Sequence, residues 1–214
     1  AAGCPHDCRY CYARYDQVVK KAEMEASQWP QARINPEEIN RQFPLFPGTV
    51  MFPTEHDIHP HILDGCLTVL KNLLAAGNTV LVVTKPHLIC VQEMCRVFGQ
   101  RQEHILFRFT ITARDNAILG LWEPGAPAYE ERLAALRYAS QQGFSTSVSI
   151  EPMLEAEHVH LLVEELLPHV SYSIWLGKMN KIKERVSCDS AEIKKDLQRI
   201  YDFQSDEMIR VIYE

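Results

Sequence analysis

The chain has 214 residues, of which 46% are hydrophobic and 23% are charged, a composition typical of globular proteins that excludes disordered, collagenous or fibrous chains. Its 22 Lys and Arg against 28 Asp and Glu give a net charge of −6, which argues against general electrostatic binding to duplex DNA or anionic lipid. No apolar run approaches the roughly 20 residues that span a bilayer, and the chain does not open on a signal-peptide pattern. Because no linker, repeat or low-complexity stretch divides it, we expect a cytoplasmic protein with one domain over residues 1–214.

Three of the seven cysteines, Cys4, Cys8 and Cys11, lie close together at the beginning of the sequence. An odd number of cysteines in a chain of this length argues against a secreted disulfide scaffold. Three thiolates on one short loop can face a common centre. They could hold a structural zinc ion if a fourth ligand such as His6 or Cys188 arrived from elsewhere, or three irons of a [4Fe–4S] cluster with the fourth iron open. Structural zinc sites usually pair their ligands in two knuckles, and the sequence has no second such pair, so the pattern favours the open cluster.

After this cysteine loop, strand and helix patterns alternate along the chain. Runs of apolar and β-branched residues predict strands over 49–52, 79–84, 105–112, 145–150 and 173–176, and the second of them reads as buried on both faces. Apolar residues at helical spacing predict helices over 61–76, 87–98, 127–143, 159–167 and 190–203, and residues 208–213 are expected to be one more extended segment. Strands that alternate with helices in this way indicate βαβ units and a parallel sheet.

Polar residues follow the predicted strands at the ends where parallel α/β barrels carry their chemistry. In chain order they are Thr54 and Glu55, then Lys85, then Thr110 and Thr112, then Ser149 and Glu151, and finally Trp175, Lys178 and Asn180. The histidines at 56, 59 and 61 beside Asp57 have the residue types of a metal site, but histidines in loops next to proline are common, and we expect no second metal there. The basic residues Lys178, Lys181, Lys183 and Arg185 could contact an anionic substrate, but a solvated surface is the favoured interpretation.

The spacing Cys-x3-Cys-x-aromatic-Cys, with Tyr10 as the aromatic residue, resembles the signature of the radical S-adenosylmethionine (SAM) superfamily. The Thr-Lys pair at 84–85, Thr-Ile-Thr at 110–112, the Glu-Pro-Gly-Ala-Pro turn at 123–127 and Glu-Arg-Leu at 131–133 resemble its spore photoproduct lyase-like branch. The resemblance spans about residues 3–180. It implies an α/β fold, a partial (β/α)6 TIM-type barrel with parallel strands and the cluster loop after the first strand. We therefore expect that first strand to be missing from this chain.

The resemblance also implies a function and a set of site residues. Cys4, Cys8 and Cys11 would hold a [4Fe–4S] cluster whose open iron is chelated by SAM. Reductive cleavage of SAM would give methionine and a 5′-deoxyadenosyl radical that abstracts hydrogen from a substrate the sequence does not identify. The electron would come from an external donor of the flavodoxin or ferredoxin type. Within the SAM site, the resemblance places Tyr10 beside the adenine, Lys85 at the carboxylate, Thr54 and Glu55 at the amino group, and Thr110 with Thr112 near the ribose.

Two alternatives stay open at this stage. One is a DNA photoproduct repair lyase; such enzymes use a cysteine hydrogen donor just after the strand that corresponds to 49–52, where this sequence reads Met-Phe-Pro-Thr-Glu at 51–55. A nucleic-acid partner is also not indicated by the charge. The other alternative is a non-catalytic zinc-binding module, in which the cysteine loop is structural and the mouth of the barrel captures a partner.

Overall fold

The computed structural model describes residues 1–205 and 207, and its centre is a five-stranded parallel sheet. The strands are β1 (Thr49–Phe52), β2 (Thr79–Thr84), β3 (Ile105–Thr110), β4 (Ser145–Ile150) and β5 (Ser173–Leu176), and they lie side by side in chain order. This confirms the predicted α/β fold with parallel strands, although β1 and β5 form open edges and the sheet does not close into a barrel within the described residues. The extended segment predicted at 208–213 lies outside the described residues.

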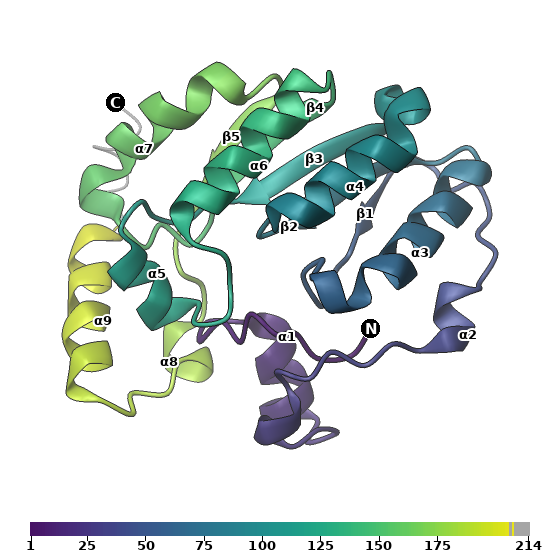
Figure 1. Cartoon of the computed structure of the whole chain (residues 1–214). Coiled ribbons are helices and arrows are strands. Elements are labelled where there is room, and N and C mark those ends of the chain that lie inside the picture. Colours follow the sequence, from purple (N-terminus) through teal and green to yellow (C-terminus); the bar gives the residue numbers. More distant parts are fainter. Residues whose placement is uncertain (206, 208–214) are drawn as a thin grey trace.

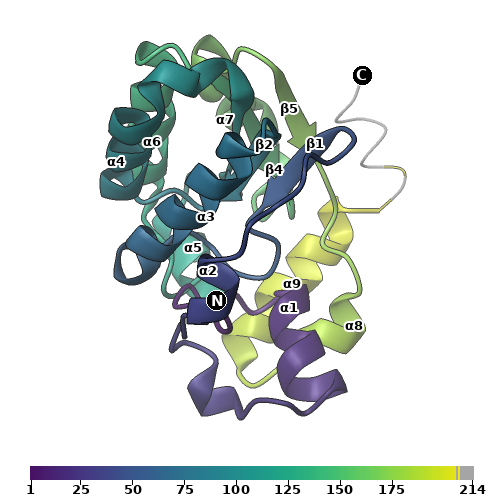
Figure 2. The same cartoon turned by 90° about the vertical axis from the view of Figure 1, so that its right-hand side faces the viewer.

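Helices connect successive strands, as the predicted βαβ units require. They are α3 (Leu63–Ala75), α4 (Leu88–Phe98), α6 (Tyr129–Gln141) and α7 (Val159–Leu166), and Figures 1 and 2 show α3, α4 and α6 on one face of the sheet. Gly77 ends α3 with a φ of +84°, a conformation that costs glycine no steric strain. The helix predicted from residue 127 begins two residues later, because Ala128 keeps an extended backbone before Tyr129.

The two faces of the sheet differ because side chains alternate along each strand. Toward the helices, Val80, Val82, Phe107, Phe109 and Val148 are all 0% exposed and form the centre of the core. The opposite face, which we call the inner face, carries Leu81, Val83, Arg108, Thr110, Ser147, Ser149 and Trp175. Leu81 and Val83 are only partly buried, so the prediction that β2 is buried on both faces holds for one face alone.

The remaining helices lie beside the sheet, and the sequence analysis predicts only the last of them, α9. They are α1 (Tyr12–Arg14) with a π-helical turn (Tyr15–Lys20), α2 (Pro36–Ile39), α5 (Asn116–Trp122), α8 (Ile182–Arg185) and α9 (Ala191–Phe203). The longest unpredicted helix is α5, which begins where Asp115 accepts a hydrogen bond from the Ala117 amide at 2.7 Å. The strand predicted over 105–112 ends two residues earlier, at Thr110. None of the described helices has the length and apolarity needed to cross a bilayer.

Candidate functional site

A cavity of about 320 Å³ lies where the cysteine loop meets the carboxyl ends of the strands. This volume is at the lower end of the range for small-molecule sites. Its polar lining comes from the cysteine loop and from the carboxyl ends of the strands and the segments that follow them: Cys4, Cys8, Tyr10, Cys11, Tyr12, Thr54, Glu55, His56, Asp57, Lys85, Thr110, Ser149, Glu151, Lys178, Asn180 and Arg185. The structure therefore brings together the three N-terminal cysteines and five of the six residues predicted to contact a cofactor, all except Thr112.

The three cysteines of the loop carry free thiols, and Cys4 and Cys8 are buried. Burial raises the pKa of the Cys4 thiol to about 12 and also raises the pKa values of Cys8 and Cys11. A group that binds these residues as thiolates must therefore supply positive charge to offset their burial. The cysteines at 66, 90 and 95 are buried in α3 and α4, the one at 188 is exposed, and none of these four lines the cavity.

The cysteine loop is held in place by the turn that follows α5. The Arg9 amide donates to the Trp122 carbonyl at 2.9 Å, and the Gly125 amide donates to the His6 carbonyl at 3.1 Å. A Cβ atom at position 125 would lie only 2.0 Å from the Pro5 carbonyl oxygen. The close approach of these two backbones therefore requires glycine at position 125.

Asp57 connects the loop after β1 to the cysteine loop and to Lys85. Its Oδ2 lies 3.0 Å from His6 Nδ1 and 3.6 Å from Lys85 Nζ, and its Oδ1 accepts the Lys85 amide at 2.6 Å. Burial alone would raise the pKa of Asp57, but the Lys85 charge and the His6 hydrogen bond hold it well below its usual range. The Cys4 thiol also points at this carboxylate, with Sγ 4.0 Å from Oδ2. Asp57 thus fixes the directions of a loop histidine and of the cavity lysine.

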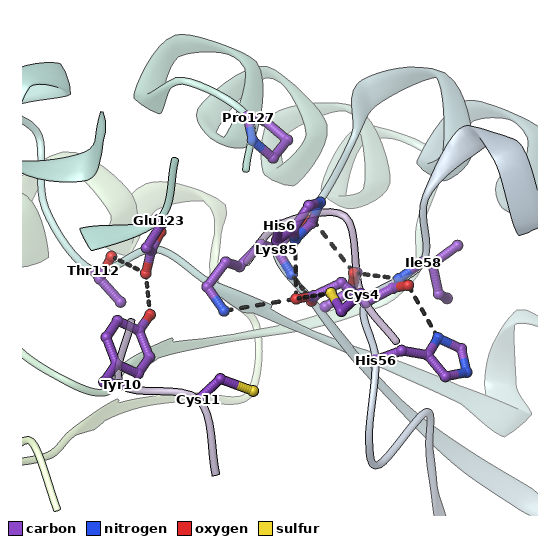
Figure 3. A network of polar contacts seen from close by, with 12 residues as sticks. Cys4, His6, Tyr10, Cys11, His56, Ile58, Lys85, Thr112, Glu123 and Pro127 are labelled. Carbon is purple, nitrogen blue, oxygen red and sulfur yellow. Dashed lines mark hydrogen bonds and ion pairs between the residues drawn. The ribbon is translucent and has the colours of Figure 1, made fainter. Parts of the chain in front are cut away.

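A second buried carboxylate, Glu123, orients Tyr10 (Figure 3). It is 1% exposed, accepts hydrogen bonds from the Tyr10 hydroxyl and from Thr112 Oγ1 at 2.9 Å, and pairs with Arg132 Nη2 at 2.6 Å. Burial would raise the pKa of Glu123, but Arg132 and Lys85 lower it below its ordinary value. The Thr112 hydroxyl is thus engaged by Glu123 and lies outside the cavity lining, so the structure does not support a cofactor contact there.

The outer wall of the cavity contains two residues of the basic cluster. Lys178 and Arg185 line the cavity, and the Arg185 guanidinium lies 5.9 Å from the centre of the Tyr12 ring. Lys178 and Arg185 are half-buried at this wall, whereas Lys181 and Lys183 are exposed and outside the lining. Arg185 is the last residue of α8, which has only four residues and is too short for apolar periodicity to predict.

Asp57 is the residue whose importance the sequence analysis missed. The sequence places Asp57 only beside the histidines at 56, 59 and 61, as part of a possible metal site. Among the described residues, the group whose ligand atoms lie within 4.8 Å of one another is instead Cys4, His6 and Asp57. The available signal was its place in the loop after β1. Chemistry gathers at the carboxyl ends of parallel strands, and the same reasoning predicts Thr54 as a site residue.

Comparisons with known proteins identify relatives of this architecture. A family model described as the Radical SAM superfamily matches residues 1–164. Among curated proteins, the uncharacterized protein ORF301 of Acidianus two-tailed virus is 23% identical over 178 residues, which cover 77% of this chain and 58% of the viral protein.

Solved structures with a similar fold include two with bound SAM. SuiB of Streptococcus suis bound to S-adenosylmethionine matches 94% of this chain and 42% of its own length, with a TM-score of 0.54 and 10% identity. A mutant spore photoproduct lyase with bound AdoMet and dinucleoside spore photoproduct matches 94% of this chain and 59% of its own, with a TM-score of 0.56 and 17% identity. The chain thus spans between 42% and 59% of the length of these relatives.

Proposed function

The chain belongs to the radical SAM superfamily, whose cofactors are a [4Fe–4S] cluster and SAM, and on that premise we propose that Cys4, Cys8 and Cys11 hold the cluster. The observation that carries the proposal is that these three free thiols line this cavity, and no other cysteine of the described residues lines it. Three thiolates fit a cluster that keeps one iron open, whereas a closed cluster or a four-cysteine zinc site requires a fourth. When bound, the reduced cluster supplies the electron that cleaves SAM to methionine and a 5′-deoxyadenosyl radical, which abstracts hydrogen from the substrate.

The residues of this chain bind and orient SAM in the proposal. Lys85 is 8% exposed and presents its ammonium to the cavity, where it pairs with the SAM carboxylate while Asp57 holds it in place. Glu55 and Thr54, at the exposed rim, bind the amino group, and the Thr110 hydroxyl binds the ribose.

Tyr10 is the residue that we place beside the adenine. Its hydroxyl is fixed by Glu123, so the ring is held in one orientation at the cavity wall. Thr112 supports the same carboxylate and therefore acts on Tyr10 through Glu123. The buried walls around these groups keep water from the reacting atoms.

An external electron donor of the flavodoxin or ferredoxin type reduces the cluster. Because all seven cysteines are free, a reducing compartment suits the chain, and we propose a cytoplasmic location and a single domain.

A structural zinc site is the second candidate, favoured by the Cys4, His6 and Asp57 group with its ligand atoms within 4.8 Å. These are ligand types that zinc accepts. In that case the loop would bind zinc tightly and the protein would not bind SAM.

Metal content after anaerobic reconstitution, together with SAM binding by equilibrium dialysis, separates the two candidates. We expect about four irons per chain and one bound SAM, with both lost in Cys8→Ala. Cys188→Ala is the matched control, because this cysteine is exposed and outside the cavity, and it should behave as wild type. Stoichiometric zinc that iron does not replace, with no SAM bound, would overturn the proposal.

A further inference from the structure

Arg108 is a cation on the inner face of the sheet, next to the cavity but outside its lining. It lies two residues before the cavity residue Thr110 on β3, so the two side chains leave the same face about 7 Å apart. Its Nε donates to Ser147 Oγ at 3.2 Å, and its guanidinium carbon lies 4.9 Å from the centre of the Trp175 ring. Within the part of the chain that the structure describes, no carboxylate lies within ion-pair distance of it.

Of the other arginines that are at least partly buried, Arg14, Arg132 and Arg199 have carboxylate partners, whereas Arg9 donates to the Leu121 carbonyl and Arg185 lies beside the Tyr12 ring. Arg132 pairs with Glu123, and Arg199 pairs with Glu157 at 2.7 Å. Arg108 has instead a hydroxyl and an indole ring, and its partial burial lowers its pKa. A cation that is partly removed from water and lacks a counter-ion costs free energy, so an anion supplied by a ligand would be stabilised there.

The surroundings of Arg108 form a small polar and aromatic patch that continues into the cavity. The Trp175 indole nitrogen donates to Ser173 Oγ at 2.9 Å, and Ser173 Oγ lies 3.0 Å from Ser147 Oγ. Trp175 remains 53% exposed, and in the sheet it pairs with Ser149, which lines the cavity. A molecule in the outer part of the cavity can therefore reach both the guanidinium and the exposed indole.

We propose that Arg108 binds a carboxylate or phosphate group of the substrate and that Trp175 contacts the organic part of the same molecule. The two terminal nitrogens of a guanidinium form a fork that matches two oxygens of either anion. An aromatic ring beside the anion site adds apolar contact area to an otherwise polar surface. The identification of the ligand as the substrate rests on the proposed function, whereas binding of an anion at Arg108 does not.

Collisional quenching of tryptophan fluorescence tests the anion site in the full chain. Of the three tryptophans, Trp29 and Trp122 are 1% and 0% exposed, so a quencher in solution reaches Trp175. Iodide, caesium and neutral acrylamide are compared at constant ionic strength, each normalised to its quenching of N-acetyltryptophanamide. A unit charge about 5 Å from the ring should make iodide about twofold more effective than caesium after screening. The net charge of −6 would by itself favour caesium.

Variants test whether the iodide preference arises from Arg108. Arg108→Gln should abolish the iodide preference and Arg108→Lys should retain it. Arg96→Gln is the matched control, because this arginine is paired with Glu93 on α4, and it should match wild type. Trp175→Phe should remove the accessible fluorescence. In wild type, millimolar inorganic phosphate or acetate should reduce iodide quenching, and the more effective of the two identifies the anion as phosphate or carboxylate.

Caesium quenching equal to or above that of iodide in wild type would overturn the proposal, and this result needs no variant to fold. An iodide preference that survives in Arg108→Gln, or that neither phosphate nor acetate reduces, would overturn it as well. The measurement requires neither iron nor SAM cleavage. Its failure is therefore distinguishable from a failure of the proposed function.

Discussion

The substitution Gly125→Ala probes how the cysteine loop is held. A Cβ atom at this position would lie 2.0 Å from the Pro5 carbonyl oxygen, and ordinary contact begins at 3.4 Å, so the loop must move by about 1.4 Å. Pro5 lies between two of the proposed cluster ligands, Cys4 and Cys8. Such a shift is well beyond the ~0.5 Å to which working sites hold their ligands. Overpacking of this kind also destabilises a fold by about 1–3 kcal/mol.

We therefore expect the Gly125→Ala protein to fold, to unfold at a lower temperature than wild type, and to lose most of its iron after anaerobic reconstitution. The measurements are iron and sulfide per chain, the electron paramagnetic resonance signal of the reduced protein, and thermal unfolding of the cluster-free protein. Gly120→Ala is the control: apart from its chain neighbours and its own helix backbone, no atom lies within 4 Å of its Cβ position, and it should stabilise α5 by about 0.5–1 kcal/mol. Wild-type iron content and stability in Gly125→Ala would refute the reasoning.

Three further substitutions test the buried charges and the core. Glu123→Gln leaves the Arg132 cation buried without its counter-charge and should cost about 3–5 kcal/mol in urea unfolding; a smaller cost than that of Tyr10→Phe would contradict the assigned ion pair. Lys85→Met removes a charge-assisted contact of about 1.5–3 kcal/mol, so SAM affinity in equilibrium dialysis should fall at least about tenfold while iron content stays constant. Unchanged SAM affinity would exclude Lys85 as the carboxylate partner. Phe107→Ala, at a fully buried core position, should cost about 3–5 kcal/mol without changing iron per folded chain, and a neutral result would argue against the assigned core.

The sequence predicted the architecture well because its strands carry apolar residues in short continuous runs. The predicted bounds of β1, β2, β4 and β5 agree with the structure, and β3 ends at Thr110. The helix α5 was missed because it has only seven residues and contains Gly120. Its apolar residues are too few to show a helical period in the sequence. Its start signal, Asp115 before an apolar run, was nevertheless present in the sequence.

The candidate site was predictable only where a local rule applied. The carboxyl end of a parallel strand, or the position just after it, located Thr54, Lys85 and Thr110, all of which line the cavity. The pairing of Asp57 with Lys85 joins segments that are 28 residues apart, and which buried carboxylate meets which cation depends on tertiary packing. The same limit applies to Thr112. It lies two residues after the cavity residue Thr110 in the sequence, but in the structure its hydroxyl donates a hydrogen bond to Glu123.

The most direct test of the central claim is production of 5′-deoxyadenosine by the reconstituted protein. Anaerobic protein is reduced with dithionite in the presence of SAM, and 5′-deoxyadenosine and methionine are quantified by chromatography against Cys8→Ala and Cys188→Ala. The account predicts equal amounts of both products from wild type and Cys188→Ala and none above background from Cys8→Ala. Iron-loaded wild-type protein that binds SAM but forms no 5′-deoxyadenosine, or formation that persists in Cys8→Ala, would contradict it.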